Sequence, residues 1–269
     1  MLATFPTPAW LVGCGNMAGA MVDGWRAGGI DFAGVTVIRP SGKPVENIRT
    51  VTNYPDERPR FVMLGFKPQK LEEIAPGLAP HIGADTILVS MLAGVTAATL
   101  RNRFPNARAI VRVMPNLPVA QVQGVTAIYS PDGGINDLIE VRQLIASLGM
   151  IVWCEEEAQL GPIGAVASAG IAYVARYIEA LGRSAETLGL RPGLAQQVAI
   201  QTLVGTAAYA ADTAADMTEI ARRVASPKGT TEQGLAVLDA ADGLQQLIDR
   251  TLAAAVRRGE ELAAETARD

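Results

Sequence analysis

A glycine-rich segment near the N-terminus carries the clearest chemical signal in the sequence. Gly13 and Gly15 follow a short apolar run and precede a helical stretch. At such a junction the first glycine permits a tight turn, and the second lets backbone N–H groups approach a pyrophosphate at the positive end of the helix. Ala18 is small enough for close helix–strand packing. The residues assigned to this predicted dinucleotide-binding loop are Gly13, Cys14, Gly15, Asn16 and Met17.

The end of the second predicted strand bears on the choice of dinucleotide. Sites that prefer NAD usually carry a carboxylate there for the ribose 2′-hydroxyl, and this strand end has none. Arg39, Ser41 and Lys43 instead offer groups that suit a 2′-phosphate. Residues 26–70 also hold eight Lys and Arg against four Asp and Glu, in a chain of net charge −4. We expect NADPH as the cofactor, with NADH as the alternative; the competing interpretation is that Arg39 and Lys43 are ordinary solvated charges.

The composition excludes several other classes of protein. A net charge of −4 argues against a generally basic nucleic-acid binder. Two cysteines and one histidine are too few for a disulfide framework or a metal site, so no metal is expected. We find no apolar run long enough to cross a membrane and no N-terminal signal segment. The expected compartment is therefore a reducing cytoplasm.

Short apolar strands alternate with helical stretches through residues 1–157. The predicted strands are Trp10–Gly13, Val35–Arg39, Phe61–Gly65, Thr86–Ser90, Ala109–Val113, Val125–Tyr129 and Met150–Cys154. Helices are expected at Ala18–Ala27, Lys70–Leu78 and Ile135–Leu148. Because these strands are apolar on both faces, they predict an α/β Rossmann-type domain with a doubly wound parallel sheet.

Residues 158–269 show helical spacing and no strand pattern. The predicted helices are Gly164–Leu188, Pro192–Ala211, Met217–Ala225 and Thr231–Ala264. Alanine dominates their apolar faces and aromatic residues are few, so this half is not expected to hide its apolar surface alone. We expect an all-α dimerisation domain that packs against a second copy. A self-contained monomeric bundle is the alternative.

Five segments in order along the chain together resemble pyrroline-5-carboxylate reductase, the NAD(P)H enzyme that makes proline. They are Gly13–Ala18, Phe66–Pro68, Ser90–Thr96, Arg112–Pro118 and the signature-like Ser-Pro-Lys-Gly-Thr-Thr of Ser226–Thr231. The resemblance implies a Rossmann domain followed by a helical domain through which two chains exchange helices. It also implies an active site near the dimer interface and, in some members, higher assemblies of dimers.

The resemblance also implies roles for residues that follow the third, fourth and fifth strands. The carboxyl ends of these strands border the ligand crevice of an open parallel sheet. Phe66, Lys67 and Pro68 are expected near the adenosine ribose and phosphates. Ala93, Gly94 and Asn116 are expected near the nicotinamide. A plain surface cation remains the alternative for Lys67.

The Ser226–Thr231 turn leads into a predicted helix whose first N–H groups could bind an anion. The natural anion is the carboxylate of the substrate, held at Ser226, Gly229 and Thr230. Thr231 is the expected catalytic residue, as hydrogen-bond partner of the ring nitrogen. Simple N-capping of the helix by threonine is the competing interpretation.

The expected reaction is hydride transfer from NADPH to the C=N bond of 1-pyrroline-5-carboxylate, which gives L-proline. Three departures from the family pattern bear on the substrate: Lys228 replaces a glycine, Ala167–Tyr173 lacks two hydroxyls and a proline, and Arg222-Arg223 replaces a Lys-Asp pair. The alternatives are a related cyclic imine and a non-catalytic dinucleotide-binding homologue. A β-hydroxyacid dehydrogenase is disfavoured because Gly164–Leu188 contains no lysine.

Overall fold

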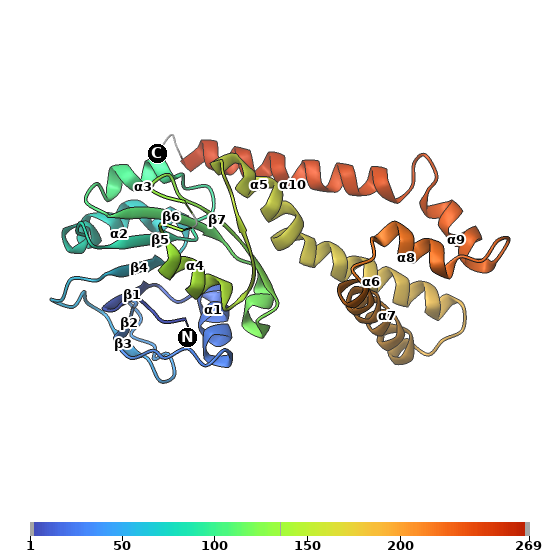
Figure 1. Cartoon of the computed structure of the whole chain (residues 1–269), viewed down its shortest axis with the longest axis horizontal. Helices are drawn as coiled ribbons and strands as arrows, with labels where there is room; N and C mark the ends of the chain where they lie inside the picture. The colour runs from blue at the N-terminus through green and yellow to red at the C-terminus, as the bar shows by residue number, and fades with distance from the viewer. Residues whose placement is uncertain (1–2, 135, 267–269) are drawn as a thin grey trace. The chain divides into compact units, whose positions relative to one another are not determined.

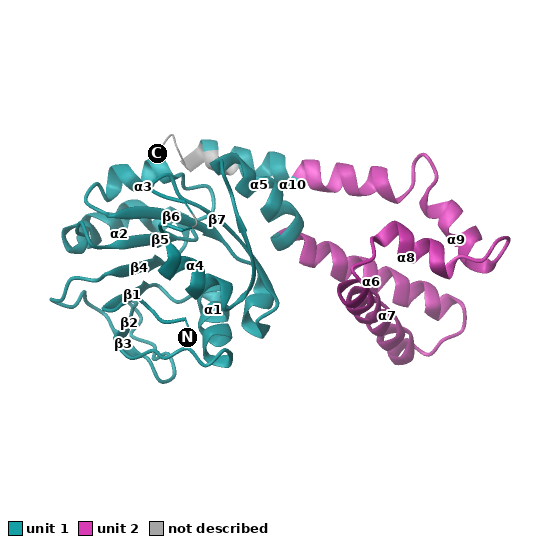
Figure 2. Ribbon diagram, in the orientation of Figure 1, with its two compact units in different colours: residues 1–168, 255–269 teal, residues 169–254 magenta. Residues whose placement is uncertain are grey.

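The computed structural model describes residues 3–134 and 136–266. These residues divide into two compact units, which are coloured separately in Figure 2. The first unit comprises Met1–Ser168 together with Ala255–Asp269, and the second comprises Ala169–Ala254. The domain boundary expected after residue 157 was drawn where the strand pattern of the sequence ends. It remains a prediction, because the two compact units are separated by a different criterion, the contacts within each unit.

The first unit is built on an eight-stranded sheet in the order β3-β2-β1-β4-β5-β6-β7-β8 (Figure 1). The strands are β1 Ala9–Val12, β2 Val35–Ile38, β3 Arg49–Val51, β4 Phe61–Leu64, β5 Ile87–Ser90, β6 Ala109–Met114, β7 Gly124–Tyr129 and β8 Gly149–Trp153. All seven predicted strands are present. The edge strand β3 was missed, because three residues are too few to show a pattern.

The expectation of a wholly parallel sheet is wrong at one pair of strands. β6 and β7 pair antiparallel, with Val113 opposite Ile128. The connection between them consists of the short 3-10 helix η3 (Leu117–Gln121) and its flanking residues. A parallel pair needs a crossover of about a dozen residues or more, and this connection is shorter. The mostly parallel, doubly wound arrangement is otherwise confirmed.

Helices cover both faces of the sheet, and the strand residues alternate between two cores. In β1, Ala9 and Leu11 belong to the core that includes α1 (Asn16–Ala27) and α4 (Ile139–Ala146). Trp10 and Val12 belong to the core that includes α2 (Leu71–Leu78) and α3 (Ala97–Arg103). This alternation is the two-residue period of a strand. It explains why strands buried on both faces read as continuous apolar runs.

Each predicted helical segment contains a helix, and the helices at Ala97–Arg103 and Leu160–Gly164 were not predicted. Their bounds are α1 Asn16–Ala27, α2 Leu71–Leu78, α3 Ala97–Arg103, α4 Ile139–Ala146, α5 Leu160–Gly164, α6 Gly170–Thr187, α7 Pro192–Thr213, α8 Met217–Val224, α9 Thr230–Leu238 and α10 Leu244–Thr266. Ile135, where one helix was expected to begin, lies outside the described residues. The single helix expected over Thr231–Ala264 is wrong, since α9 and α10 are separate. A Cβ atom on Gly243 would lie 2.2 Å from the Leu238 carbonyl oxygen, so this break needs glycine.

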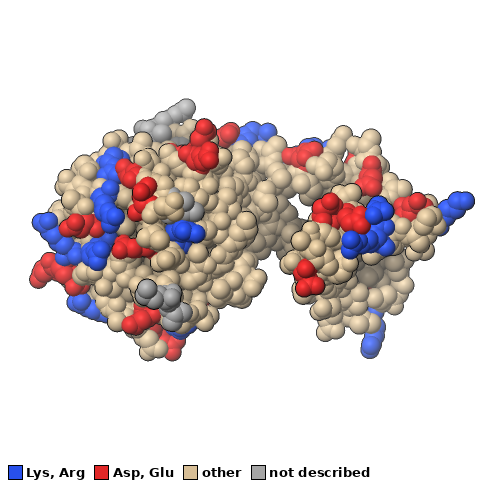
Figure 3. All heavy atoms as spheres, viewed as in Figure 1, with Lys and Arg blue, Asp and Glu red and all other residues tan. Residues whose placement is uncertain are grey.

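The second unit has almost no core of large side chains. Among its described residues, the buried ones are Gly182 on α6 and Ala195 and Ala199 on α7. Large apolar side chains are instead exposed along the same helices, for example Leu181, Val198 and Val204. On the face shown in Figure 3, acidic and basic side chains are intermixed and wide areas carry neither. Such a surface needs a partner to cover it.

One helical stretch, Glu157–Thr187, is long and apolar enough to meet a length-and-composition criterion for a membrane span. Its most apolar window has a mean hydropathy of 1.3 and is 17% buried. No apolar run of this length was expected, but the helix continues through Gly161, Pro162 and Gly164. This is weak evidence for a membrane segment, because helices of cores and interfaces also meet the criterion.

Candidate functional site

A cleft of about 740 Å³ lies at the carboxyl ends of β1, β2 and β4. It brings together the predicted loop residues Gly13–Met17 with Arg39, Ser41, Phe66 and Lys67. The cleft is also lined by residues with no predicted binding role, among them Thr52, Tyr54, Lys70, Glu73, Ile74 and Met91. Pro68, Ala93, Gly94, Asn116 and Lys43 are not among the described residues that line it.

The turn after β1 can be formed only by glycine. Gly13 has a φ of +84°, and a Cβ atom there would lie 2.8 Å from the Gly65 carbonyl oxygen. A Cβ atom on Gly65 would in turn lie 2.9 Å from the Ala18 Cβ atom. The loop, the start of α1 and the end of β4 therefore pack backbone to backbone. This confirms the tight turn expected at Gly13 and the close helix–strand packing expected at Ala18.

Gly15 leaves the start of α1 open on the side of the cleft. It is the N-cap of α1, no side chain of the described residues caps this helix end, and its first turn has no acidic residue. A Cβ atom on Gly15 would meet only the Gly65 carbonyl oxygen, at 3.8 Å, so packing does not require glycine here. N–H groups at an uncapped helix start, with room beside them, suit a bound phosphate.

Arg39 and Ser41 form a linked pair beyond the end of β2. The Arg39 Nε atom donates to the Ser41 Oγ atom at 3.1 Å, and the Lys43 backbone N–H donates to the same oxygen at 3.4 Å. Ser41 therefore orients the guanidinium along one edge and leaves its two terminal nitrogens for a ligand. The Lys43 side chain is exposed outside the cleft, whereas Lys70, paired with Glu73 at 3.8 Å, lines it.

An aromatic group supports one wall of the cleft. The ring of Tyr54 stacks on Trp10, with centroids 6.0 Å apart and planes at 21°, and lies 5.1 Å from the ring of His81. Burial raises the pKa of the Tyr54 phenol. His81 is itself half-buried. Thr52 and Tyr54 were missed because they follow β3, the strand that left no pattern.

Cys14 sits in the phosphate loop as a free thiol. Burial raises its pKa, and the nearby positive charge of Arg39 partly opposes that effect. The thiol is therefore protonated at neutral pH and acts as a small polar filler.

Asn116 has both ends of its side chain engaged within the first unit. It is 6% exposed; its Nδ2 atom donates to the Ala167 carbonyl oxygen at 2.9 Å, and its Oδ1 atom accepts from the Val125 N–H at 2.8 Å. Ala167 lies in a π-helical turn, Ala165–Ala169, so the Asn116 amide ties this turn to the residues that follow β6. The contact expected between Asn116 and the nicotinamide remains a prediction.

The Ser226–Thr231 turn lies in the second unit and has a tightly defined backbone. The Gly229 N–H donates to the Ser226 carbonyl oxygen at 2.9 Å, and a Cβ atom on Gly229 would lie 2.3 Å from the Ser226 Oγ atom. Lys228 has a φ of +58°, a left-handed conformation that favours glycine. Its backbone N–H donates to the Glu232 Oε2 atom at 2.6 Å.

The start of α9 tests the interpretation in which a threonine caps the helix. Gly229 is the N-cap of α9, and no side chain of the described residues caps this end. Capping by threonine, the competing interpretation, is therefore wrong. The side chains of Ser226, Thr230 and Thr231 are exposed and are not used to stabilise the helix.

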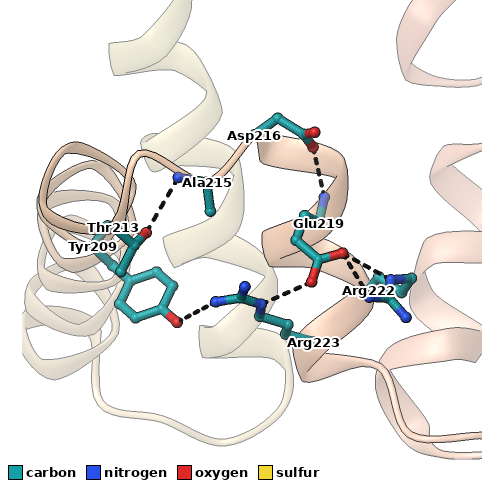
Figure 4. Close-up of polar contacts among 7 residues, drawn as sticks. All are labelled: Tyr209, Thr213, Ala215, Asp216, Glu219, Arg222 and Arg223. Atoms are coloured by element: carbon teal, nitrogen blue, oxygen red, sulfur yellow. Dashed lines mark hydrogen bonds and ion pairs between the residues drawn. The ribbon is translucent and has the colours of Figure 1, made fainter.

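The helix that precedes this turn is tied to α7 by a polar cluster (Figure 4). The Arg223 Nη1 atom donates to the Tyr209 hydroxyl on α7 at 3.1 Å, and Arg223 and Arg222 both donate to the Glu219 carboxylate. The hydrogen bonds from Arg223 and then Arg222 hold the pKa of Glu219 below its usual range. Arg222-Arg223, which departs from the family pattern, thus orients α8 (Met217–Val224).

Comparison with known proteins gives a consistent assignment. The family profile described as "Pyrroline-5-carboxylate reductase dimerisation" matches residues 157–262. The chain is 31% identical over 265 residues to the pyrroline-5-carboxylate reductase of Pseudomonas aeruginosa, covering 94% of this chain and 95% of the other. It is 35% identical over 207 residues to that of Synechocystis, covering 75% and 74%.

Solved structures show the same fold. The pyrroline-5-carboxylate reductase of Coxiella burnetii superposes with a TM-score of 0.85 at 28% identity, covering 96% of this chain and 99% of the other. A Plasmodium falciparum pyrroline carboxylate reductase with NADP bound superposes with a TM-score of 0.83 at 21% identity, covering 95% and 97%. With the loop, the strand ends and the turn in place, this similarity over nearly the full length is decisive: the chain belongs to the pyrroline-5-carboxylate reductase family.

Proposed function

We propose that this protein reduces the C=N bond of 1-pyrroline-5-carboxylate to give L-proline, with NADPH as the reductant. The observation that carries the proposal is the cleft of about 740 Å³. Both the open start of α1 and the Arg39–Ser41 pair line this cleft. Membership of the family supports the choice of substrate. NADPH, when bound, supplies the hydride.

Each part of the cleft has a role in holding the cofactor. The uncapped N–H groups after Gly15 bind the pyrophosphate. Arg39, with Ser41 behind it, binds the 2′-phosphate, and Lys70, the N-cap of α2, adds a second cation. Phe66 and Lys67 lie along the phosphates, with Pro68 beginning the 3-10 turn η1 (Pro68–Lys70). Lys43 contributes through its backbone N–H, which holds Ser41.

The nicotinamide and the substrate are held by the remaining predicted residues. The loop with Ala93 and Gly94, after β5, flanks the nicotinamide ring, and the backbone of Asn116 borders it. In the second unit, Ser226, Gly229 and Thr230 bind the substrate carboxylate at the uncapped start of α9. The Thr231 hydroxyl hydrogen-bonds the ring nitrogen and relays to it a proton from water, while the carbon gains hydride.

The catalytic effect comes mainly from positioning. A protonated C=N bond accepts hydride far more readily than a neutral one. Since the turn supplies no strong acid, the protein favours reaction by fixing the carboxylate and the ring nitrogen relative to the reductant.

The protein acts as a homodimer in this proposal. The exposed apolar side chains of α6 and α7 and the match to a dimerisation profile support it. We also propose that these dimers associate into larger assemblies. The free thiols of Cys14 and Cys154 fit a reducing compartment such as the cytoplasm.

The direct test follows NADPH oxidation with pyrroline-5-carboxylate and, side by side, with a pyrroline that lacks the carboxylate. We expect strong preference for the carboxylate-bearing ring. The Thr231→Ala variant should lose much of its kcat/KM, whereas Thr231→Ser, which keeps the hydroxyl, should retain it. An unchanged kcat/KM in Thr231→Ala would refute the role of that hydroxyl.

A second candidate is reduction of a related cyclic imine. Ala167, Ala169 and Ile171 stand where the family has hydroxyls and a proline, so this segment is more apolar. Equal or faster turnover of the carboxyl-free ring would favour this candidate. Tight NADPH binding without turnover of either ring would instead indicate a non-catalytic homologue.

A further inference from the structure

A single carboxylate joins three elements of the first unit. Glu157 is the first residue of the 3-10 helix η4 (Glu157–Gln159), and its Oε1 atom accepts two hydrogen bonds. One comes from the Arg112 Nη1 atom on β6, at 2.8 Å, and the other from the Ala97 backbone N–H, at 2.7 Å. These donors are 45 and 60 residues away in the sequence. The contact therefore links β6, α3 and the start of the long helical stretch.

The contact is partly buried. The Arg112 side chain is 11% exposed and that of Glu157 is 29% exposed, while Ala97 is buried. A donor in such a place that loses its acceptor is not readily satisfied by water, so removal of the carboxylate is costly. The Arg103–Glu72 pair in the same unit is different, with side chains 39% and 55% exposed. Pairs of that kind contribute little.

The Ala97 N–H lies at the end of the loop that we assign to the nicotinamide. Residues 91–96 connect β5 to α3, and Gly94 in this loop has a φ of +78°. At the start of the loop, the Ser90 Oγ atom accepts a hydrogen bond from the Leu92 N–H at 3.2 Å. At its far end, Thr96 caps α3 through Thr99, and Glu157 holds Ala97. Glu157 thus sets where the far end of the loop stands relative to β6.

We propose that Glu157 is a positioning residue for hydride transfer: by holding the Ala97 N–H beside Arg112, it keeps loop 91–96 where the nicotinamide ring requires it. This inference rests on the proposed function, because it needs the loop to contact the cofactor. The carboxylate does not touch the cofactor and acts through the loop.

Three variants and one control separate this role from a general loss of stability. Glu157→Gln keeps an oxygen that can accept both hydrogen bonds and removes the charge. Glu157→Ala removes the acceptor. Ala97→Pro removes the N–H alone; proline is accepted at the first position of a helix, and Thr96 before it is extended, with φ −77° and ψ 160°. Glu72→Gln, in the exposed pair, is the matched control.

Activity and loop order are measured on the same preparations. Activity is followed as kcat, KM for each substrate and the primary isotope effect with NADPH deuterated at C4. Loop order is followed by hydrogen exchange of peptides covering 91–103, and cofactor affinity by NADPH titration.

We expect Glu157→Ala and Ala97→Pro to lower kcat on the order of 10- to 100-fold, with a larger isotope effect, because misplacement slows the chemical step. Exchange in 91–103 should quicken in both. NADPH affinity should be retained, since the phosphate loop is untouched. Glu157→Gln should stay near wild type in kcat and exchange, and Glu72→Gln should match wild type throughout.

The proposal is overturned if folded Glu157→Ala and Ala97→Pro keep the kcat and isotope effect of the wild type. It is also overturned if exchange in 91–103 is unchanged. Should Glu157→Ala fail to fold, Ala97→Pro and Glu157→Gln carry the same test. A wild-type protein that binds NADPH but reduces no imine refutes the proposed function, and with it the catalytic part of this inference. In that case the hydrogen-exchange data still test whether Glu157 orders loop 91–96, independently of catalysis.

Discussion

Replacing Arg39 with methionine is expected to move the cofactor preference from NADPH toward NADH. The Nε atom of Arg39 is already engaged with the Ser41 Oγ atom at 3.1 Å, so two terminal nitrogens remain for the 2′-phosphate. Hydrogen bonds to a charged group contribute about 1.5–3 kcal/mol each. Because Arg39 is partly exposed and screened by salt, we expect the two bonds together to contribute only as much as one unscreened bond, about 1.5–3 kcal/mol.

That free energy corresponds to a loss of about 10- to 150-fold in kcat/KM with NADPH. NADH lacks the 2′-phosphate, so its kcat/KM should hardly change. The assay compares both cofactors at a fixed imine concentration over a range of ionic strength, with Arg103→Met in the exposed Arg103–Glu72 pair as the control. The NADPH advantage of the wild type should also shrink as salt rises. A ratio of the two cofactors that is the same in Arg39→Met and wild type would refute the assignment.

Three further predictions concern packing, backbone conformation and titration. Gly24→Ala places a Cβ atom 2.0 Å from the Val119 carbonyl oxygen, so it should lower the free energy of unfolding by about 1–3 kcal/mol or more, seen as a reduced denaturant midpoint. Lys228→Gly should relieve about 1–2 kcal/mol of left-handed backbone strain, while the more flexible unfolded chain should cost about 0.4–1 kcal/mol. The variant should therefore be at least as stable as wild type, and a denaturant midpoint below that of wild type would contradict this. Because burial raises the pKa of Cys14, its alkylation by iodoacetamide near pH 9 should be slower in the folded protein than in urea, as mass spectrometry would measure. The stability linked to this thiol is present below its unfolded pKa and is lost as pH rises through the higher folded value, so a folded protein that is no less stable above that pH would argue against the shift.

The phosphate loop could be predicted because its requirements are local. A turn with φ of +84° at Gly13 and an open helix start at Gly15 are properties of a few neighbouring residues, and those residues are visible in the sequence. Arg39 and Ser41 could be found for the same reason, since they follow a strand that reads clearly. Thr52 and Tyr54 line the same cleft but follow β3, whose three residues carry no recognisable period.

The amino-acid sequence by itself determined the alternation of strands and helices, the helical second half and the residue types at the phosphate loop and the Ser226–Thr231 turn. These follow from periodicity, glycine placement and small apolar side chains, which act over a few residues. Only the tertiary structure decided that β6 and β7 run antiparallel, that Asn116 supports a π-helical turn, and that one oxygen of Glu157 holds both Arg112 and Ala97. Such pairings join groups dozens of residues apart, and no local pattern specifies which donor will meet which acceptor once the chain has folded.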